Sequence, residues 1–281
     1  MRNLVITLLL ALASPAFAQF PTFNHVFIVV EENTNYASVV GNSSMPYFNS
    51  LAQKYGLATQ YYANTHPSIG NYFMLTTGQI ITNNDSHGAT VTADNVVRHL
   101  LTAGKTWKAY EESLPSVGYI SPNTGNYVRR HCPLSYFSDV VNSSAQKLHL
   151  VPFTQFAKDR VNNALPKYSF ITPNLCNDAH NCSLSTADAW MKNNIDPLVR
   201  GASFQSGDLL IIVFDESAND NTNGGGRIAW VAISPKYSKP GYKSVVKYQH
   251  QNTLRLMLQG LGVTSYPGSA SSASNMAEFF K

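Results

Sequence analysis

Four acidic residues form two adjacent pairs, and each pair directly follows a hydrophobic run. Glu31 and Glu32 come near the end of HVFIVVEEN (25–33), and Asp215 and Glu216 end the run LLIIVFDE (209–216). A carboxylate at the end of a buried strand is costly unless it is paired or holds a cation. The Glu31–Glu32 pair alone could equally be a solvated loop. A second acidic pair at a second strand end favours a binding site.

The same two strand ends carry the oxygen atoms that a hard cation prefers. If the strands are neighbours, Glu32 and Asn33 converge with Asp215 and Glu216. Carboxylate and amide oxygens suit Mg²⁺ or Ca²⁺ better than Zn²⁺. The sequence therefore predicts a site for a divalent cation, Mg²⁺ or Ca²⁺ in preference to Zn²⁺.

Ser68 lies in the stretch HPSIGNY (66–72), at the start of an apolar run with helical spacing. One interpretation is a helix cap, which contributes about 1 kcal/mol. The other is a nucleophile, because a bound cation lowers the pKa of a coordinated hydroxyl. The N–H groups at the start of the helix, together with the side chain of Asn71, could then hold a phosphate.

Asp178 and His180 lie on the loop CNDAHNC (176–182), which follows an expected strand. A single histidine on a loop is usually only solvated. Here we interpret His180, with Asp178 beside it, as a group that binds phosphate or protonates a leaving oxygen. His250 starts the last expected helix, and a structural role is the favoured interpretation for it.

Three cysteines follow the N-terminal region: Cys132, Cys176 and Cys182. In an oxidising compartment two of them should pair. Cys176–Cys182 is favoured because the loop between them is short, and Cys132–Cys176 is the alternative. The spacing lacks the CxxC pairs typical of a zinc site.

The N-terminal sequence MRNLVITLLLALASPAFAQF is typical of a secretory signal peptide, with a basic residue, an apolar core and small residues before the expected cut after Ala18. We therefore expect residues 1–18 to be removed and the protein to be secreted, or periplasmic in a Gram-negative bacterium. No later stretch approaches the roughly 20 apolar residues of a membrane span, so stable membrane insertion is not expected. Four sequons, at Asn42, Asn84, Asn142 and Asn181, predict a glycoprotein if the route is eukaryotic, although no glycan is expected at Asn181, next to the candidate site.

The remaining residues, 19–281, are expected to form one α/β domain. Strands are predicted at 25–33, 57–63, 106–113, 168–174, 208–217 and 227–235. Helices are predicted at 45–56, after Pro67, and at 94–105, 153–164, 185–200 and 250–262. The helix at 185–200 should begin with a capping box formed by Ser185 and Asp188. This alternation indicates a largely parallel central sheet with helices on both faces, a three-layer sandwich. A net charge of +4 is too small to indicate a nucleic-acid partner.

Several segments, in this order, resemble the secreted family of acid phosphatases and phospholipases C within the alkaline phosphatase-like superfamily. They include HVFIVVEEN, NTHPSIGNYFMLTTG, GKTWKAYEESLP, YSFITPNLCNDAHNCS, LLIIVFDES followed by GGGRIAWVAISP, and HQNTLRLM. The resemblance covers nearly the whole chain from His25, and it is specific as a combination.

The resemblance implies a role for each matching residue. Glu32 with Asn33, and Asp215 with Glu216, match two pairs of metal ligands. Ser68 matches the nucleophile, which also contacts the metal. Asn71 matches a phosphate contact, and Asp178 with His180 matches the phosphate pocket. The chain departs from many relatives at Gly70, where they have proline, and at Arg227, where they have histidine.

These observations predict a secreted, metal-dependent acid phosphatase that cleaves small phosphate monoesters through a phosphoserine on Ser68. The alternative is a phospholipase C acting on phospholipid diesters, although no clear interfacial helix is seen. A catalytically inactive secreted binding protein is a remote alternative, because it predicts loss of the nucleophile or the acids, and all are present.

Overall fold

The computed structural model describes residues 20–281, so the predicted signal peptide lies outside the described residues. Ten strands are present: β1 (Val26–Glu31), β2 (Gly56–Ala58), β3 (Tyr61–Tyr62), β4 (Trp107–Glu111), β5 (Leu150–Pro152), β6 (Tyr168–Thr172), β7 (Leu209–Phe214), β8 (Trp230–Ile233), β9 (Lys243–Ser244) and β10 (Tyr248–Gln249). The described helices are α1 (Tyr36–Val39), α2 (Pro46–Lys54), α3 (Ser68–Thr77), α4 (Val96–Thr102), α5 (Ser138–Val141), α6 (Ser144–Lys147), α7 (Thr154–Val161), α8 (Leu184–Asn194), α9 (Asp196–Val199), α10 (Ala202–Gln205) and α11 (His250–Gly260), with short 3-10 turns such as η1 (Arg129–His131).

Eight strands form one central sheet in the order β5-β4-β6-β1-β7-β8-β2-β9. The strands from β5 to β7 are parallel to one another, whereas β8 is antiparallel to both β7 and β2. β1 (VFIVVE) and β7 (LLIIVF) are hydrophobic except for Glu31 at the end of β1, and every residue of both strands is buried, as expected for strands covered on both faces. The largely parallel three-layer α/β fold is therefore confirmed.

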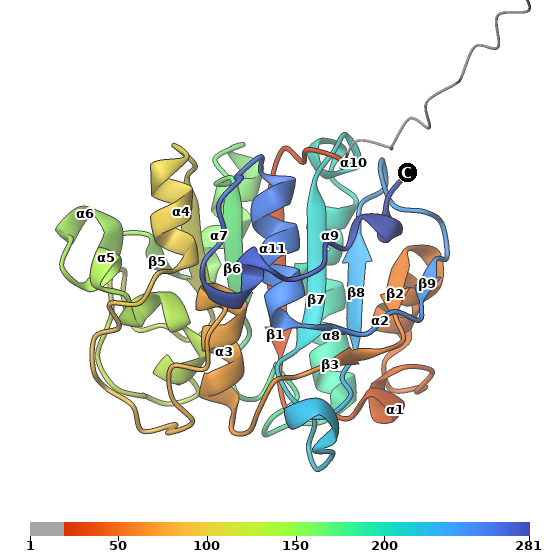
Figure 1. Cartoon of the computed structure of the whole chain (residues 1–281), viewed down its shortest axis with the longest axis horizontal. Coiled ribbons are helices and arrows are strands. Elements are labelled where there is room, and N and C mark those ends of the chain that lie inside the picture. The colour runs from red at the N-terminus through yellow and green to blue at the C-terminus, as the bar shows by residue number, and fades with distance from the viewer. Residues whose placement is uncertain (1–19) are drawn as a thin grey trace, which may run out of the picture.

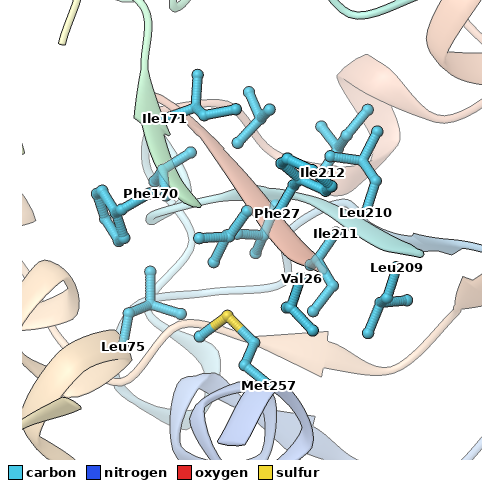
Figure 2. Packing of buried hydrophobic residues seen from close by; sticks show 14 of the residues in the cluster. Val26, Phe27, Leu75, Phe170, Ile171, Leu209, Leu210, Ile211, Ile212 and Met257 are labelled. Atoms are coloured by element: carbon cyan, nitrogen blue, oxygen red, sulfur yellow. The ribbon is translucent and has the colours of Figure 1, made fainter. Parts of the chain in front are cut away.

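Helices cover both faces of the sheet (Figure 1). On one face α3, α4 and α11 pack together. Leu75 of α3 and Met257 of α11 lie on the same side of β1 as Val26 (Figure 2). On the other face Phe27 contacts Phe156 of α7 and Phe204 of α10. The two layers hold β1 and β7 rigidly, and these strands carry the acidic pairs.

Two local predictions were wrong. The stretch 57–63 is not one strand, because β2 joins the main sheet while β3 pairs with β10 in a separate two-stranded sheet. The predicted capping box at Ser185 is also absent: Ser183 caps α8 by accepting a hydrogen bond from the Thr186 N–H. The carboxylate of Asp188 instead accepts the N–H groups of Tyr47 and Phe48 at the start of α2.

The cysteine prediction is confirmed, because Cys176 and Cys182 form a disulfide and Cys132 is buried with a free thiol. Within residues 20–281 no helix is long and apolar enough to cross a membrane. Glycosylation at Asn42, Asn84 and Asn142 stays a prediction.

Glu111, the last residue of β4, gives a testable pH dependence of stability. It is 1% exposed, and burial raises its pKa from 4.5 to about 8, opposed by bonds with Cys132 and Thr172. A carboxyl with a raised folded-state pKa favours folding below its unfolded pKa, and this contribution is lost as the pH rises towards 8. Glu111→Gln should therefore gain stability relative to wild type as the pH rises, by a few kcal/mol near pH ~9. Melting temperatures of both proteins between about pH 5 and about pH 9 test this, and a difference that stays constant would contradict it.

Candidate active site

The two acidic pairs meet because β1 and β7 are adjacent and in register. Glu31 of β1 pairs with Phe214 of β7, so Glu32 and Asp215 leave the sheet side by side. The Asp215 N–H also donates to the Glu31 carbonyl at 2.8 Å. The neighbouring strands that the sequence analysis required are therefore present, and the site lies at the carboxyl ends of parallel strands, as is usual in such folds.

Ser68 is the first residue of α3, and its hydroxyl lies between carboxylates from both strands. Its Oγ is 3.2 Å from Glu32 Oε2 and 3.3 Å from Glu216 Oε1, and the residue is only 3% exposed. The N-cap position of α3 is Pro67, and the Ser68 side chain makes no capping hydrogen bond to the helix. The helix-cap interpretation of Ser68 is therefore wrong, and the hydroxyl instead faces the acidic groups.

The amide and carboxylate groups next to Ser68 leave several oxygen atoms unused. Asn33 has a left-handed backbone with φ of 42°, and its N–H donates to Asp215 Oδ1 at 3.1 Å. Asp215 Oδ1 also accepts the Glu216 N–H at 2.6 Å. Asn33 Oδ1 and Asp215 Oδ2 are buried without a hydrogen-bond partner in residues 20–281. Unsatisfied buried oxygens of this kind are costly unless a cation binds them.

Burial and mutual repulsion disfavour the charged form of these carboxyls. Burial raises the pKa of Glu32, and it raises that of Asp215 well above its ordinary value, with the Glu32 charge adding to the rise. Burial and then the Asp215 charge raise the pKa of Glu216 to about 8, and His66 opposes this rise. A divalent cation among the three groups would reverse all three effects.

These donor atoms fit a hard cation only when the amide and hydroxyl oxygens are included. No three His, Cys, Asp or Glu side chains in the described part of the chain form a metal-binding group by themselves. The predicted set adds Asn33 and Ser68 to Glu32, Asp215 and Glu216. An all-oxygen set of this kind is suited to Mg²⁺ or Ca²⁺.

Asn71 positions the turn before Ser68. Its Oδ1 accepts the N–H groups of Asn64 and Thr65, and its Nδ2 donates to the Thr65 carbonyl at 2.8 Å and to Glu216 Oε2 at 3.4 Å. Both amide protons are therefore used. The predicted contact of Asn71 with a phosphate requires its bond to Glu216 to be given up.

Asp178 and His180 differ in their access to the site. Asp178 is buried, and its carbonyl accepts the Glu32 N–H at 2.8 Å. His180 is exposed, and its Nδ1 lies 2.7 Å from Asn181 Oδ1. Its charge still opposes the rise in the pKa of Glu32. Asp178 thus lies in the interior of the site, whereas His180 lies at its solvent-exposed edge. A histidine in that position can donate a proton to a leaving group.

The sequence analysis missed His131, which lies inside the site. His131 is 2% exposed and stacks on Tyr72 of α3, with ring centroids 4.9 Å apart. Its Nε2 lies 3.0 Å from Glu32 Oε1 and its Nδ1 lies 3.6 Å from Asp178 Oδ2. Burial lowers the pKa of His131 to about 4. No periodicity marks the segment around it, so only the residue type could have drawn attention to it.

Two further histidines support Glu216 and Asp215. His66 Nδ1 lies 2.8 Å from Glu216 Oε2, and His66 Nε2 lies 3.1 Å from the Asp220 carbonyl. His66 stands two residues before Ser68, and this proximity was the only signal for it. The ring of His250 is buried and its Nε2 bonds to the Asp215 carbonyl at 2.6 Å. The structural role favoured for His250 is therefore confirmed.

The two positions that depart from many relatives, Gly70 and Arg227, have different surroundings. Gly70 lies in the first turn of α3, and a Cβ there would overlap the side chains of Asn83 and Thr65. The segment after α3 thus approaches the helix closely at this point. The guanidinium of Arg227 lies over Tyr36, 3.8 Å from the ring centroid.

The arrangement can carry out a displacement at an electrophilic centre. A buried hydroxyl at a helix start faces two carboxylate oxygens that can accept its proton, and the positive end of the helix dipole favours an anion. Unused oxygens next to the hydroxyl can hold a cation that stabilises negative charge.

Comparisons with known proteins agree with this chemistry. The family model described as the phosphoesterase family matches residues 42–264. A phosphatidylinositol-3-phosphatase of Mycobacterium tuberculosis is 34% identical over 260 residues, which cover 91% of this chain and 83% of that protein. Acid phosphatases of Kluyveromyces lactis (described as probable) and Aspergillus fumigatus are each 34% identical over 69% of this chain. The matched regions cover 48% and 45% of these fungal proteins, so the chain spans less than half their length.

Solved structures share the fold at low sequence identity. A protein of the alkaline phosphatase superfamily from Vibrio parahaemolyticus has a TM-score of 0.62 and 11% identity, covering 86% of this chain and 67% of that one. The lipoteichoic acid synthase LtaP of Listeria monocytogenes has a TM-score of 0.64 and 12% identity, covering 92% and 76%. The chain therefore has an alkaline phosphatase-like fold.

Proposed function

Because this chain belongs to the phosphoesterase family, we propose that it is a secreted, metal-dependent acid phosphatase acting on phosphate monoesters. One observation carries the proposal: Ser68 Oγ lies between Glu32 and Glu216, at 3.2 Å and 3.3 Å, at the start of a helix. The relatives from Mycobacterium tuberculosis and Kluyveromyces lactis are phosphatases by name, which favours a monoester over the phosphodiester alternative.

In the proposed reaction Ser68 Oγ attacks phosphorus while the bond from phosphorus to the ester oxygen breaks, which gives a phosphoserine and releases the alcohol. The hydroxyl proton of Ser68 leaves along one of its two hydrogen bonds, to Glu32 Oε2 or Glu216 Oε1. Water then cleaves the phosphoserine, and the two displacements together retain configuration at phosphorus. A bound cation would supply charge stabilisation to the phosphoryl oxygens and to the Ser68 oxygen.

The other residues of the site position these groups. His66 and Asn71 orient Glu216, while His131 contacts Glu32 and Asp178. Asn33, Glu32, Asp215 and Glu216 would hold the cation together with Ser68. His180, at the solvent-exposed edge of the site, would donate a proton to the departing oxygen.

Export rests on the leader-like sequence at residues 1–18 and on the Cys176–Cys182 disulfide, which is typical of an oxidising compartment. Comparison of the N-terminus of the cell-associated and released protein tests this directly.

Hydrolysis of p-nitrophenyl phosphate by the purified protein tests the activity. We expect turnover that is highest at acidic pH, is lost on chelation and returns with Mg²⁺ or Ca²⁺. p-Nitrophenyl phosphorylcholine serves as the diester control, and its turnover should be much slower. Preferred cleavage of the diester would replace the proposed function by that of a phospholipase C. Hydrolysis that is unaffected by chelation would refute the metal dependence.

A further inference from the structure

The segment after α3 returns over the start of this helix and places a carboxylate there. Gly70 lets Asn83 approach the first turn, because a Cβ at this position would overlap the Asn83 side chain. Two residues further on, Asp85 Oδ1 accepts the Ile69 N–H at 3.2 Å. Ile69 directly follows Ser68, so the acceptor lies one residue from the reacting hydroxyl.

The second oxygen of Asp85 lies near Arg130, whose Nε makes no hydrogen bond in the described structure. Asp85 Oδ2 lies 3.5 Å from Arg130 Nε. This nitrogen is buried and makes no hydrogen bond within residues 20–281. The Arg130 side chain is 15% exposed, whereas that of Asp85 is 36% exposed. The arginine side chain is thus mostly buried, and its carboxylate partner is the more accessible of the two.

Arg130 lies close to residues of the candidate active site. It directly precedes His131, whose Nε2 lies 3.0 Å from Glu32 Oε1. Its charge also opposes the rise in the pKa of Glu32. Asp85 therefore connects the helix that carries Ser68 to the turn that carries His131, and it contacts a helix N–H and a guanidinium, the two kinds of donor that bind phosphate in proteins.

The charge of the site makes this contact unusual. Glu32, Asp178, Asp215 and Glu216 are all buried carboxyl groups. A phosphate monoester is an anion, so it needs positive groups to enter beside them. Arg130 is such a group, but a carboxylate of this chain already lies against it. Binding of phosphate to Arg130 requires the contact between Arg130 and Asp85 to be broken. The free energy of that contact therefore weakens phosphate binding.

From this geometry we propose that Arg130 binds the phosphate group of the substrate, and that Asp85 occupies Arg130 and the Ile69 N–H until the substrate displaces it. This inference rests on the proposed phosphatase function and extends it, because it names a substrate-binding residue and the carboxylate that competes for it. The ligand is a phosphate group, either of an ester or of inorganic phosphate.

Two substitutions should change substrate binding in opposite directions. Arg130→Gln removes a charge-assisted contact and should raise KM for p-nitrophenyl phosphate about tenfold or more. Asp85→Asn keeps an acceptor for the Ile69 N–H but removes the competing charge, and it should lower KM by about two- to fivefold. The value of kcat should change less than KM in both variants. An ion pair with only a structural role would instead weaken binding and lower the melting temperature in both.

The double variant and a matched control sharpen the test. If Asp85 acts through Arg130, most of the effect of Asp85→Asn should vanish in the Arg130→Gln background. Asp139→Asn breaks another Arg–Asp pair, in which Arg98 and Asp139 are 2.9 Å apart and join α4 to α5. This control should leave KM unchanged.

Calorimetric titration with inorganic phosphate separates this inference from the proposed function. Even if the protein hydrolyses no monoester, Asp85→Asn should bind inorganic phosphate about two- to fivefold more tightly than wild type, and Arg130→Gln should bind it more weakly. If Arg130→Gln does not fold, the Asp85→Asn titration decides alone. Unchanged or weaker phosphate binding by Asp85→Asn would overturn the inference.

Discussion

Replacement of Ser68 by alanine should lower phosphatase turnover by about 10⁴-fold or more while leaving the fold intact. Within the described structure Ser68 supplies the hydroxyl that lies between Glu32 and Glu216 at the start of α3. Its removal takes away the proposed nucleophile. Because Ser68 does not cap the helix, alanine should fit without the loss that follows removal of a capping side chain.

The measurement compares kcat for p-nitrophenyl phosphate with the melting temperature of the same preparations. Acid-quenched wild type should also contain a phosphoserine at residue 68, which mass spectrometry of the peptide detects. Ser169→Ala is a suitable control, because Ser169 is a fully buried serine on β6 that contacts none of the site residues. Turnover by Ser68→Ala within about a factor of ten of wild type would remove Ser68 from the mechanism.

The part of the site that was predicted from the sequence lies where regular structure ends. Glu32 follows β1 and Asp215 follows β7, and both strands were recognisable as long hydrophobic runs. In a parallel sheet such strand ends meet at one edge. The start of α3 was equally clear, because an apolar run follows Pro67. The hydrophobic patterns of β1, β7 and α3 thus made the positions of Glu32, Asp215 and Ser68 predictable.

Residues that reach their place only through tertiary contacts could not be predicted from such patterns. His131 lies on η1, in a segment with no periodic pattern, and only the packing of its ring on Tyr72 brings it to Glu32. Asp188 was assigned to its own helix but caps α2 from a distance in sequence. Short strands failed for the same reason, since β3 pairs with β10 through contacts that its own two residues do not specify.

Asp215→Asn should lower activity and yet not lower the stability of the metal-free protein. Asp215 is fully buried, and its Oδ2 has no partner within residues 20–281. An asparagine can still accept the N–H groups of Asn33 and Glu216 through Oδ1, so the local backbone should stay in place. Loss of one negative ligand should weaken cation binding and lower kcat by about a hundredfold or more.

The stability of the same variant distinguishes a cation site from a structural cluster. In chelator-treated wild type the carboxyls of Glu32, Asp215 and Glu216 lie close together and buried, and removing one charge from such a group relieves repulsion. The metal-free variant should therefore melt at the same temperature as metal-free wild type or higher, while Mg²⁺ or Ca²⁺ should raise the melting temperature of wild type only.

The control is Asp208→Asn at the opposite end of β7, where Asp208 is also buried but pairs with His25 at 3.0 Å. That variant should lose stability with and without metal, yet keep its response to the cation. If Asp215→Asn behaved in the same way as this control, the oxygen cluster would be a structural element, and the proposed chemistry would have to proceed without a cation held by Asp215.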